Sequence, residues 1–159
     1  MRERNHWKYT SRRPSATMGL GERLGRAASP GMVFALVGDL GLGKTHFVRG
    51  FAQGVGVVDL RDVVSPTYTL ANEYPAQDRL LVHMDFYRLT DSESARGLGL
   101  EEPLGRKDTV AVIEWADKIP DLIPEEAVWV RFEWMSPRER HIEVTGLECP
   151  KGLRLIEHL

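Results

Sequence analysis

The chain has 159 residues, of which 42% are hydrophobic and 28% charged, and a formal net charge of −2. This length is typical of one domain, and the near-neutral charge argues against a strongly basic surface as the main functional feature. The single cysteine, Cys149, excludes an intramolecular disulfide and a zinc site built from several cysteines. Because there is neither an apolar run of about 18 residues nor a secretory signal, we expect a cytoplasmic protein that does not enter the membrane.

Positive charge is concentrated at the N-terminus, where residues 1–13 contain five Arg or Lys side chains and one Glu. A basic segment of this kind is either a contact for nucleic acid or a loosely held extension. We predict the second: residues 1–14 form a disordered tail, and residues 15–159 form a single domain.

Hydrophobic spacing predicts a strand–loop–helix unit in the N-terminal half. Apolar residues at helical spacing predict a first helix over residues 15–28, although three glycines argue against it. Residues 32–37 are an unbroken apolar run, which is typical of a strand buried on both faces. Residues 44–55 carry apolar side chains on one helical face. A strand, a glycine-rich loop and a helix therefore follow one another directly.

The remaining sequence predicts mainly strands. Residues 65–74 are a polar extended segment that a turn at 75–78 joins to the next strand, and residues 91–98 form a short helix. Strands are predicted at residues 79–84, 109–113, 128–134, 140–145 and 153–156. These elements predict one α/β domain with parallel strands at the centre of its sheet, an antiparallel portion towards the C-terminus, and helices on both faces.

Residues 38–45 read GDLGLGKT and match the phosphate-loop pattern G-x-x-x-x-G-K-[ST], which predicts a P-loop NTPase-like domain. Gly38 and Gly43 let the backbone turn and approach a ligand. The N–H groups of the loop and of the next helix can bind phosphate oxygens. Lys44 would neutralise the β- and γ-phosphates, and the Thr45 hydroxyl would bind Mg²⁺. The predicted nucleotide contacts of the loop are Gly38, Asp39, Leu40, Gly41, Leu42, Gly43, Lys44, Thr45 and His46.

Two carboxylates follow predicted strands and are candidates for catalysis. Glu114 ends the buried strand 109–113, where a carboxylate supports the metal or a water molecule; the alternative is a strand end that faces solvent. Asp85 lies in the segment HMDFYR, where alternation puts His83, Asp85 and Tyr87 on one face. Asp85 is a second candidate for binding the metal or positioning water. His83 and Tyr87 are interpreted as structural neighbours.

Three further features are candidates for contact with a nucleotide. The polar segment Ser65–Thr69 either responds to a γ-phosphate, as switch segments do, or is an edge strand. Trp115 either stacks near a base or packs in the core. Arg138, in a turn between two predicted strands, either reaches the nucleotide or is a solvated charge.

Five segments resemble the TsaE family of small bacterial ATPases in their order and spacing, and the resemblance covers about residues 15–145. They are GDLGLGKTHFVRG (38–50), SPTYTLANEY (65–74), HMDFYRL (83–89), GLEEPL (99–104) and IEWADKI (113–119). The phosphate loop alone occurs in many proteins, whereas its combination with the S-P-T, H-x-D-x-Y-R and E-W segments is specific.

The resemblance implies a protein that binds ATP with Mg²⁺ and docks on the TsaB–TsaD pair. TsaD transfers the threonylcarbamoyl group to adenosine 37 of tRNAs that read codons beginning with A, and ATP hydrolysis drives cycling of the complex rather than the transfer. It also implies roles for individual residues: metal binding by Thr45 and Glu114, an essential aspartate at Asp85, a switch threonine at Thr67, and nucleotide contacts by Trp115 and Arg138.

The sequence departs from the family pattern at three places. His46 replaces a threonine, Leu42 stands where alanine is frequent, and Pro103-Leu104 replaces an aromatic pair. Two other classes stay open: a small P-loop kinase, against which the chain shows no arginine-rich lid, and a module that binds ATP without hydrolysing it. A GTPase is disfavoured, because the N-K-x-D sequence that reads guanine is missing.

Overall fold

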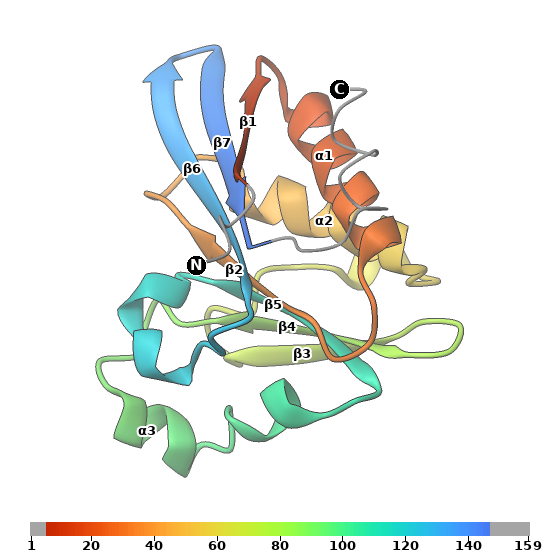
Figure 1. Cartoon of the computed structure of the whole chain (residues 1–159), viewed down its shortest axis with the longest axis vertical. Helices are drawn as coiled ribbons and strands as arrows, with labels where there is room; N and C mark the ends of the chain where they lie inside the picture. The colour runs from red at the N-terminus through yellow and green to blue at the C-terminus, as the bar shows by residue number, and fades with distance from the viewer. Residues whose placement is uncertain (1–5, 147–159) are drawn as a thin grey trace.

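The computed structural model describes residues 6–146, which form a mixed sheet covered by helices (Figure 1). The strand order in this part of the chain is β1-β7-β6-β2-β5-β4-β3. The strands are β1 (His6–Ser11), β2 (Val33–Val37), β3 (Ala71–Pro75), β4 (Leu80–Asp85), β5 (Thr109–Glu114), β6 (Val128–Ser136) and β7 (Glu139–Thr145). The helices are α1 (Pro14–Ala27), α2 (Lys44–Val55) and α3 (Ser92–Gly97), with four 3₁₀ turns, η1 (Leu60–Asp62), η2 (Glu102–Gly105), η3 (Ala116–Lys118) and η4 (Pro120–Leu122).

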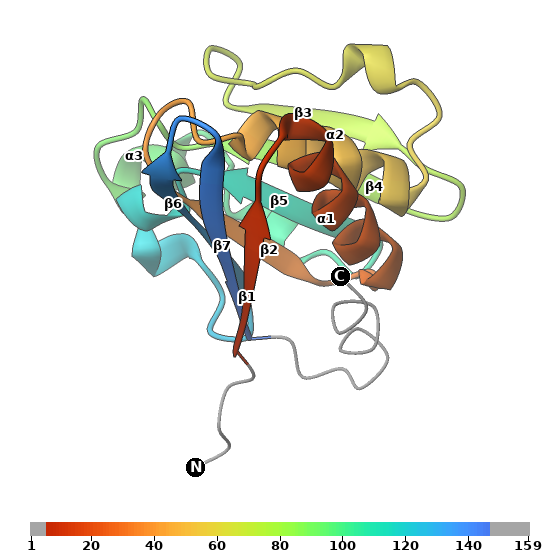
Figure 2. The ribbon, with the colours of Figure 1, turned by 90° about the horizontal axis from the view of Figure 1, so that it is seen from above.

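The centre of the sheet is parallel and both of its edges are antiparallel. Strand β2 pairs in parallel with β5 and β6, and β4 pairs in parallel with β5. Strands β3, β7 and β1 add antiparallel pairs. Helices α1 and α2, with η1, cover one face, and α3 with η2, η3 and η4 covers the other (Figures 1 and 2). The prediction of one α/β domain with this division of strands is therefore confirmed. No helix within residues 6–146 is long and apolar enough to cross a membrane.

The prediction of a disordered tail is wrong for the part of it that the structure describes. Residues 6–11 form β1, which pairs along its whole length with β7, and α1 begins at Pro14. Trp7 and Tyr9 pack against the core, and the buried Ser11 bonds the Thr17 hydroxyl at 2.7 Å. The prediction followed the charge of this segment, although Trp7 and Tyr9 alternate along it and aromatic residues are enriched in strands.

Of two further strand predictions, one is confirmed only in part and the other is not tested. In the extended segment predicted at 65–74 only residues from Ala71 onward are a strand; before it the chain turns, with the Leu70 N–H bonded to the Pro66 carbonyl at 2.7 Å. The left-handed backbone at Leu70, with φ of 69°, makes this turn possible. The strand predicted at 153–156 lies outside the described residues.

Glycines on α1 and α2 let the two helices touch backbone to backbone. A Cβ on Gly21 would lie 2.2 Å from the Phe47 carbonyl oxygen, and one on Gly50 would lie 1.9 Å from that of Met18. Gly25 and Gly54 meet the opposite helix in the same way. Two of the three glycines that weaken the prediction of α1, Gly21 and Gly25, are therefore residues that dock it. Together with Gly50 and Gly54 they hold α2, which carries Lys44 and Thr45 at its start, against α1.

Replacing Gly21 by alanine should destabilise the protein. The new methyl group overlaps the Phe47 carbonyl, and overpacking of this kind costs about 1–3 kcal/mol. Gly19→Ala in the same helix is the matched control, because a Cβ at this position would meet nothing within 4 Å. This control should gain up to about 1 kcal/mol from helix propensity. Urea unfolding measures both, and equal stabilities for the two variants would contradict the close packing.

Candidate functional site

The glycine-rich loop runs from the buried strand β2 into α2, as predicted. Gly38, Gly41 and Gly43 all have positive φ, between 79° and 151°, which glycine adopts without strain. A Cβ on Gly38 would also lie 2.8 Å from the Phe132 carbonyl oxygen, so β6 leaves no room for a side chain there. Helix α2 begins directly after Gly43. Its first N–H groups lack partners within the helix, which makes this end of α2 suited to an anion.

Lys44 is only 5% exposed and its ammonium group lies at the mouth of the loop. Its Nζ donates to the Asp39 carbonyl at 2.8 Å and to the Gly38 carbonyl. Burial lowers the pKa of Lys44, although the charges of Glu114 and Asp85 oppose that shift. The ring centroid of Trp115 lies 4.2 Å from Nζ, within the range of a cation–π contact. The cation is thus held between loop carbonyls and an indole ring.

Asp85 and Glu114 lie side by side because β4 and β5 are parallel and these two residues are partners in register. Both side chains are buried, and hydroxyl groups connect them. The Ser65 hydroxyl lies 2.8 Å from Asp85 Oδ2 and 3.1 Å from Glu114 Oε2. Asp85 Oδ2 also accepts from Thr67 at 3.0 Å, and Glu114 Oε1 accepts from Thr45 at 3.2 Å. The structure therefore brings together the four predicted site residues Thr45, Thr67, Asp85 and Glu114, which lie on four separate segments of the sequence.

Two members of this cluster were not among the predicted site residues. Ser65 begins the S-P-T segment and bridges the two carboxylates. His83, interpreted from the sequence as a structural neighbour, lies with Nε2 2.8 Å from Glu114 Oε2. The alternation that placed His83 on the face of Asp85 was the available signal for it, because side chains at i and i+2 of a strand share a face.

Trp115 is half-buried: it packs against the core on the α3 side of the sheet and also lines the cavity beside the loop. Its backbone is left-handed, with φ of 58°, which is rare for a bulky residue and marks a local constraint. The indole contacts Lys44 and the ring of Tyr87, whose centroid is 5.0 Å away. Trp115, Thr67, Asp85 and Glu114 line one cavity of about 440 Å³ together with residues 40, 41 and 43–46 of the loop and the start of α2.

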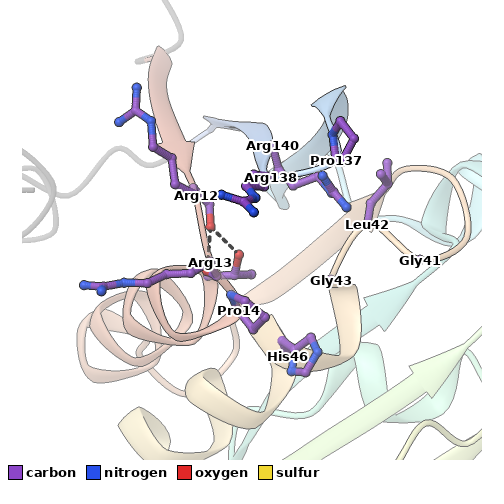
Figure 3. Close-up of a pocket in the computed structure, with 12 residues that line it drawn as sticks. Arg12, Arg13, Pro14, Gly41, Leu42, Gly43, His46, Pro137, Arg138 and Arg140 are labelled. Atoms are coloured by element: carbon purple, nitrogen blue, oxygen red, sulfur yellow. Dashed lines mark hydrogen bonds between the residues drawn. The ribbon is translucent and has the colours of Figure 1, made fainter.

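A second cavity, of about 420 Å³, lies on the other side of residues 41–43 (Figure 3). Arg138 lines it from the turn between β6 and β7, Arg140 from the start of β7, and His46 from α2. The side chains of Arg12 and Arg13 extend away from it, although their backbone forms part of its wall. Among residues 6–146, those that line this cavity include no carboxylate, so in this part of the chain the loop separates an acidic side from a basic side.

The fold and the site together define an α/β protein built around a glycine-rich strand–loop–helix unit with two carboxylates at neighbouring strand ends. A family model described as "Threonylcarbamoyl adenosine biosynthesis protein TsaE" matches residues 11–142. The chain therefore belongs to the TsaE family.

Individual relatives agree with this assignment. A Bacillus subtilis protein named tRNA threonylcarbamoyladenosine biosynthesis protein TsaE is 36% identical over 140 residues, which cover 88% of this chain and 85% of the relative. A Treponema pallidum protein of the same name is 35% identical over 137 residues, 86% of this chain and 98% of the relative. The crystal structure of Bacillus subtilis YdiB matches with a TM-score of 0.78 and 30% identity, over 99% of this chain and 96% of that one.

Glu114 should contribute an acid-sensitive part of the stability. Burial disfavours its charge, but hydrogen bonds from His83, Ser65 and Thr45 outweigh burial and hold the pKa of Glu114 below its usual value. A carboxyl whose pKa is lower in the folded state stabilises the fold above the unfolded pKa of about 4.3, and this contribution disappears as the pH falls through the folded pKa. Glu114→Gln should therefore lose less stability than the wild type between about pH 5 and pH 3.

Urea unfolding across this pH range checks the expectation. Glu126→Gln removes the same charge from an exposed position and serves as the control, with the acid dependence of the wild type. Parallel pH dependences for Glu114→Gln and the wild type would contradict it.

Proposed function

We propose that this chain binds ATP with Mg²⁺, hydrolyses it, and serves the threonylcarbamoyl modification of adenosine 37 in tRNAs that read codons beginning with A. One observation carries the nucleotide part: the hydrogen-bonded cluster of Thr45, Ser65, Asp85 and Glu114 lies beside Lys44 at the mouth of the loop. A phosphate-binding loop, a cation and oxygen donors are the groups that phosphoryl transfer requires. Membership of the TsaE family supports the tRNA part.

The donor set fits Mg²⁺. This ion prefers oxygen ligands and is usually held by one or two carboxylates together with substrate phosphates and water. The Thr45 hydroxyl and Glu114 would hold it, with Asp85 as a further ligand or as the group that positions water. No group of three or more His, Cys, Asp or Glu in residues 6–146 could hold a metal alone. When bound, Mg²⁺ would neutralise charge on the β- and γ-phosphates.

The two sides of the loop suggest how ATP lies. The γ-phosphate belongs on the side of Lys44, Glu114 and Trp115, where the cation and the oxygen donors are. The ribose and base then extend towards Arg138 and His46 in the second cavity. The planar Arg138 guanidinium suits stacking on a base or contact with a phosphate.

A protein partner is supported by the surface around the γ-phosphate side. Leu40, which is 80% exposed, and the exposed Tyr87 both line the cavity on this side, and Tyr68, which is 84% exposed, follows Thr67 directly in the chain. Apolar side chains gathered at the rim of a site are typical of interaction surfaces. We propose that they face TsaB and TsaD and that tRNA is reached only through that complex. Thr67 would act as the switch, because a γ-phosphate or its metal would compete with Asp85 for the Thr67 hydroxyl.

A module that binds ATP without hydrolysing it is the second candidate. Asp85 and Glu114 lie close enough to share the Ser65 hydroxyl. If both carboxylates served only to hold the metal, neither would position the water that attacks the γ-phosphate. Phosphate release from ATP, measured with and without TsaB and TsaD, distinguishes the two. We expect slow release by the isolated chain and a loss of roughly 100-fold in Asp85→Asn, because a group that supports the metal or positions water is removed.

Lys44→Ala should weaken ATP binding at least about 10-fold while the fold persists. The ammonium is the cation nearest the proposed phosphates, and hydrogen bonds to charged groups contribute about 1.5–3 kcal/mol each. Calorimetry with ATP measures the effect, and circular dichroism checks the fold. Lys107→Ala, at an exposed lysine outside both cavities, should bind like the wild type. Unchanged affinity in folded Lys44→Ala would refute the site.

Association with TsaB–TsaD should be stronger with ATP than with ADP, because ligands that prefer the same conformation strengthen each other's binding. Thr67→Ala should reduce this difference more than it reduces ATP affinity. Thr69→Ala is the control, since the Thr69 hydroxyl bonds Asn72 rather than Asp85. Equal association with ATP, with ADP and without nucleotide, measured by calorimetry, would exclude the switch.

A further inference from the structure

His83 is a fully buried polar residue in the middle of an apolar strand. It lies on β4 opposite Val112 of β5, and both side chains are 0% exposed. Its Nε2 lies 2.8 Å from Glu114 Oε2. Since an ionised carboxylate only accepts hydrogen bonds, Nε2 carries the hydrogen and donates it.

The two oxygens of Glu114 have different partners. Oε1 accepts from the Thr45 hydroxyl at 3.2 Å, whereas Oε2 accepts from His83 and from Ser65. We propose that His83 is a positioning residue that holds Glu114 by Oε2 and thereby keeps Oε1 turned towards the Thr45 hydroxyl. The inference rests on the proposed Mg²⁺–nucleotide site, in which Thr45 and Glu114 would share the metal.

The second ring nitrogen of His83, Nδ1, argues that the imidazole does more than fill space in the core. Nδ1 is buried and has no hydrogen-bond partner among residues 6–146. An unpaired buried polar atom costs about 1–3 kcal/mol, and a leucine at this position would avoid that cost. The bond from Nε2 to Glu114 is the contact that only a donor at this position can make.

His83 acts through Glu114 rather than on a ligand. It is not among the residues that line the cavity at Lys44 and Glu114. One nitrogen is engaged by the carboxylate and the other is enclosed, so neither reaches the space that the phosphates would occupy. Outer partners that orient a metal ligand typically change metal affinity by 10–100-fold when they are removed.

Two substitutions separate the hydrogen bond from the packing. His83→Leu keeps a buried side chain of similar size without a donor, and His83→Gln keeps an N–H donor at a similar reach. Met84→Leu is the control, because Met84 is buried on the same strand but packs into the core on the α3 side of the sheet, away from Glu114. Calorimetry with a non-hydrolysable ATP analogue, titrated at several Mg²⁺ concentrations and in EDTA, gives the metal dependence of nucleotide affinity without turnover.

The expected result is a rise of about 10-fold or more in the Mg²⁺ concentration needed by His83→Leu, with affinity in EDTA unchanged. His83→Gln should restore most of the metal dependence, and Met84→Leu should behave as the wild type. An unchanged metal dependence in His83→Leu, or equal defects in the Leu and Gln variants, overturns the role of His83 alone. A wild type that shows no Mg²⁺-dependent nucleotide binding overturns the proposed function together with this inference.

A measurement on the wild type keeps the test valid if His83→Leu does not fold. Nitrogen-15 NMR of the histidine rings reports which nitrogen carries the hydrogen. Hydrogen on Nε2 of His83, with a coupling or shift that disappears in Glu114→Ala, which removes the acceptor, supports the positioning bond. Hydrogen on Nδ1 only, with Nε2 bare, overturns it.

Discussion

Two carboxylates, Asp85 and Glu114, lie next to each other with almost no exposure to water, and the rest of the site is arranged around that constraint. Buried like charges repel and lose their hydration, so each needs donors that replace water. Thr45, Ser65, Thr67 and His83 supply those donors. The buried ammonium of Lys44 adds the opposite charge nearby.

The donors come from different parts of the chain, so the cluster depends on how the elements are docked. Thr45 belongs to the first turn of α2, and the position of α2 follows from its glycine contacts with α1. His83 and the two carboxylates depend on the register of β4 and β5. The turn that ends at Leu70 places Ser65 and Thr67 over Asp85. A small shift of any one element would leave a buried charge with fewer donors.

The same arrangement divides the surroundings of the loop by charge. Carboxylates and Trp115 lie on one side, and Arg138 of the β6–β7 turn and Arg140 of β7 lie on the other. The basic N-terminal segment contributes to the second side through its backbone, because pairing of β1 with β7 brings residues 11–14 next to that turn. A segment that its charge marked as a loose extension is therefore part of the framework of a cavity.

The sequence by itself determined the strand–loop–helix unit, and it predicts the candidate site residues around that unit. The apolar run of β2, the glycine pattern of the loop and the periodicity of α2 are local signals, and they suffice to identify Lys44 and Thr45. Asp85 and Glu114 were identified because each ends an apolar strand.

Only the tertiary structure decided which side chains meet. The bonds of His83 and Ser65 to Glu114, the contact of Trp115 with Lys44, and the strand made by the N-terminal segment all join residues far apart in the chain. Local periodicity states which face of a strand a side chain occupies, but not which strand lies beside it or in what register. The left-handed backbone at Trp115 is likewise imposed from outside, since a bulky residue has no local preference for it.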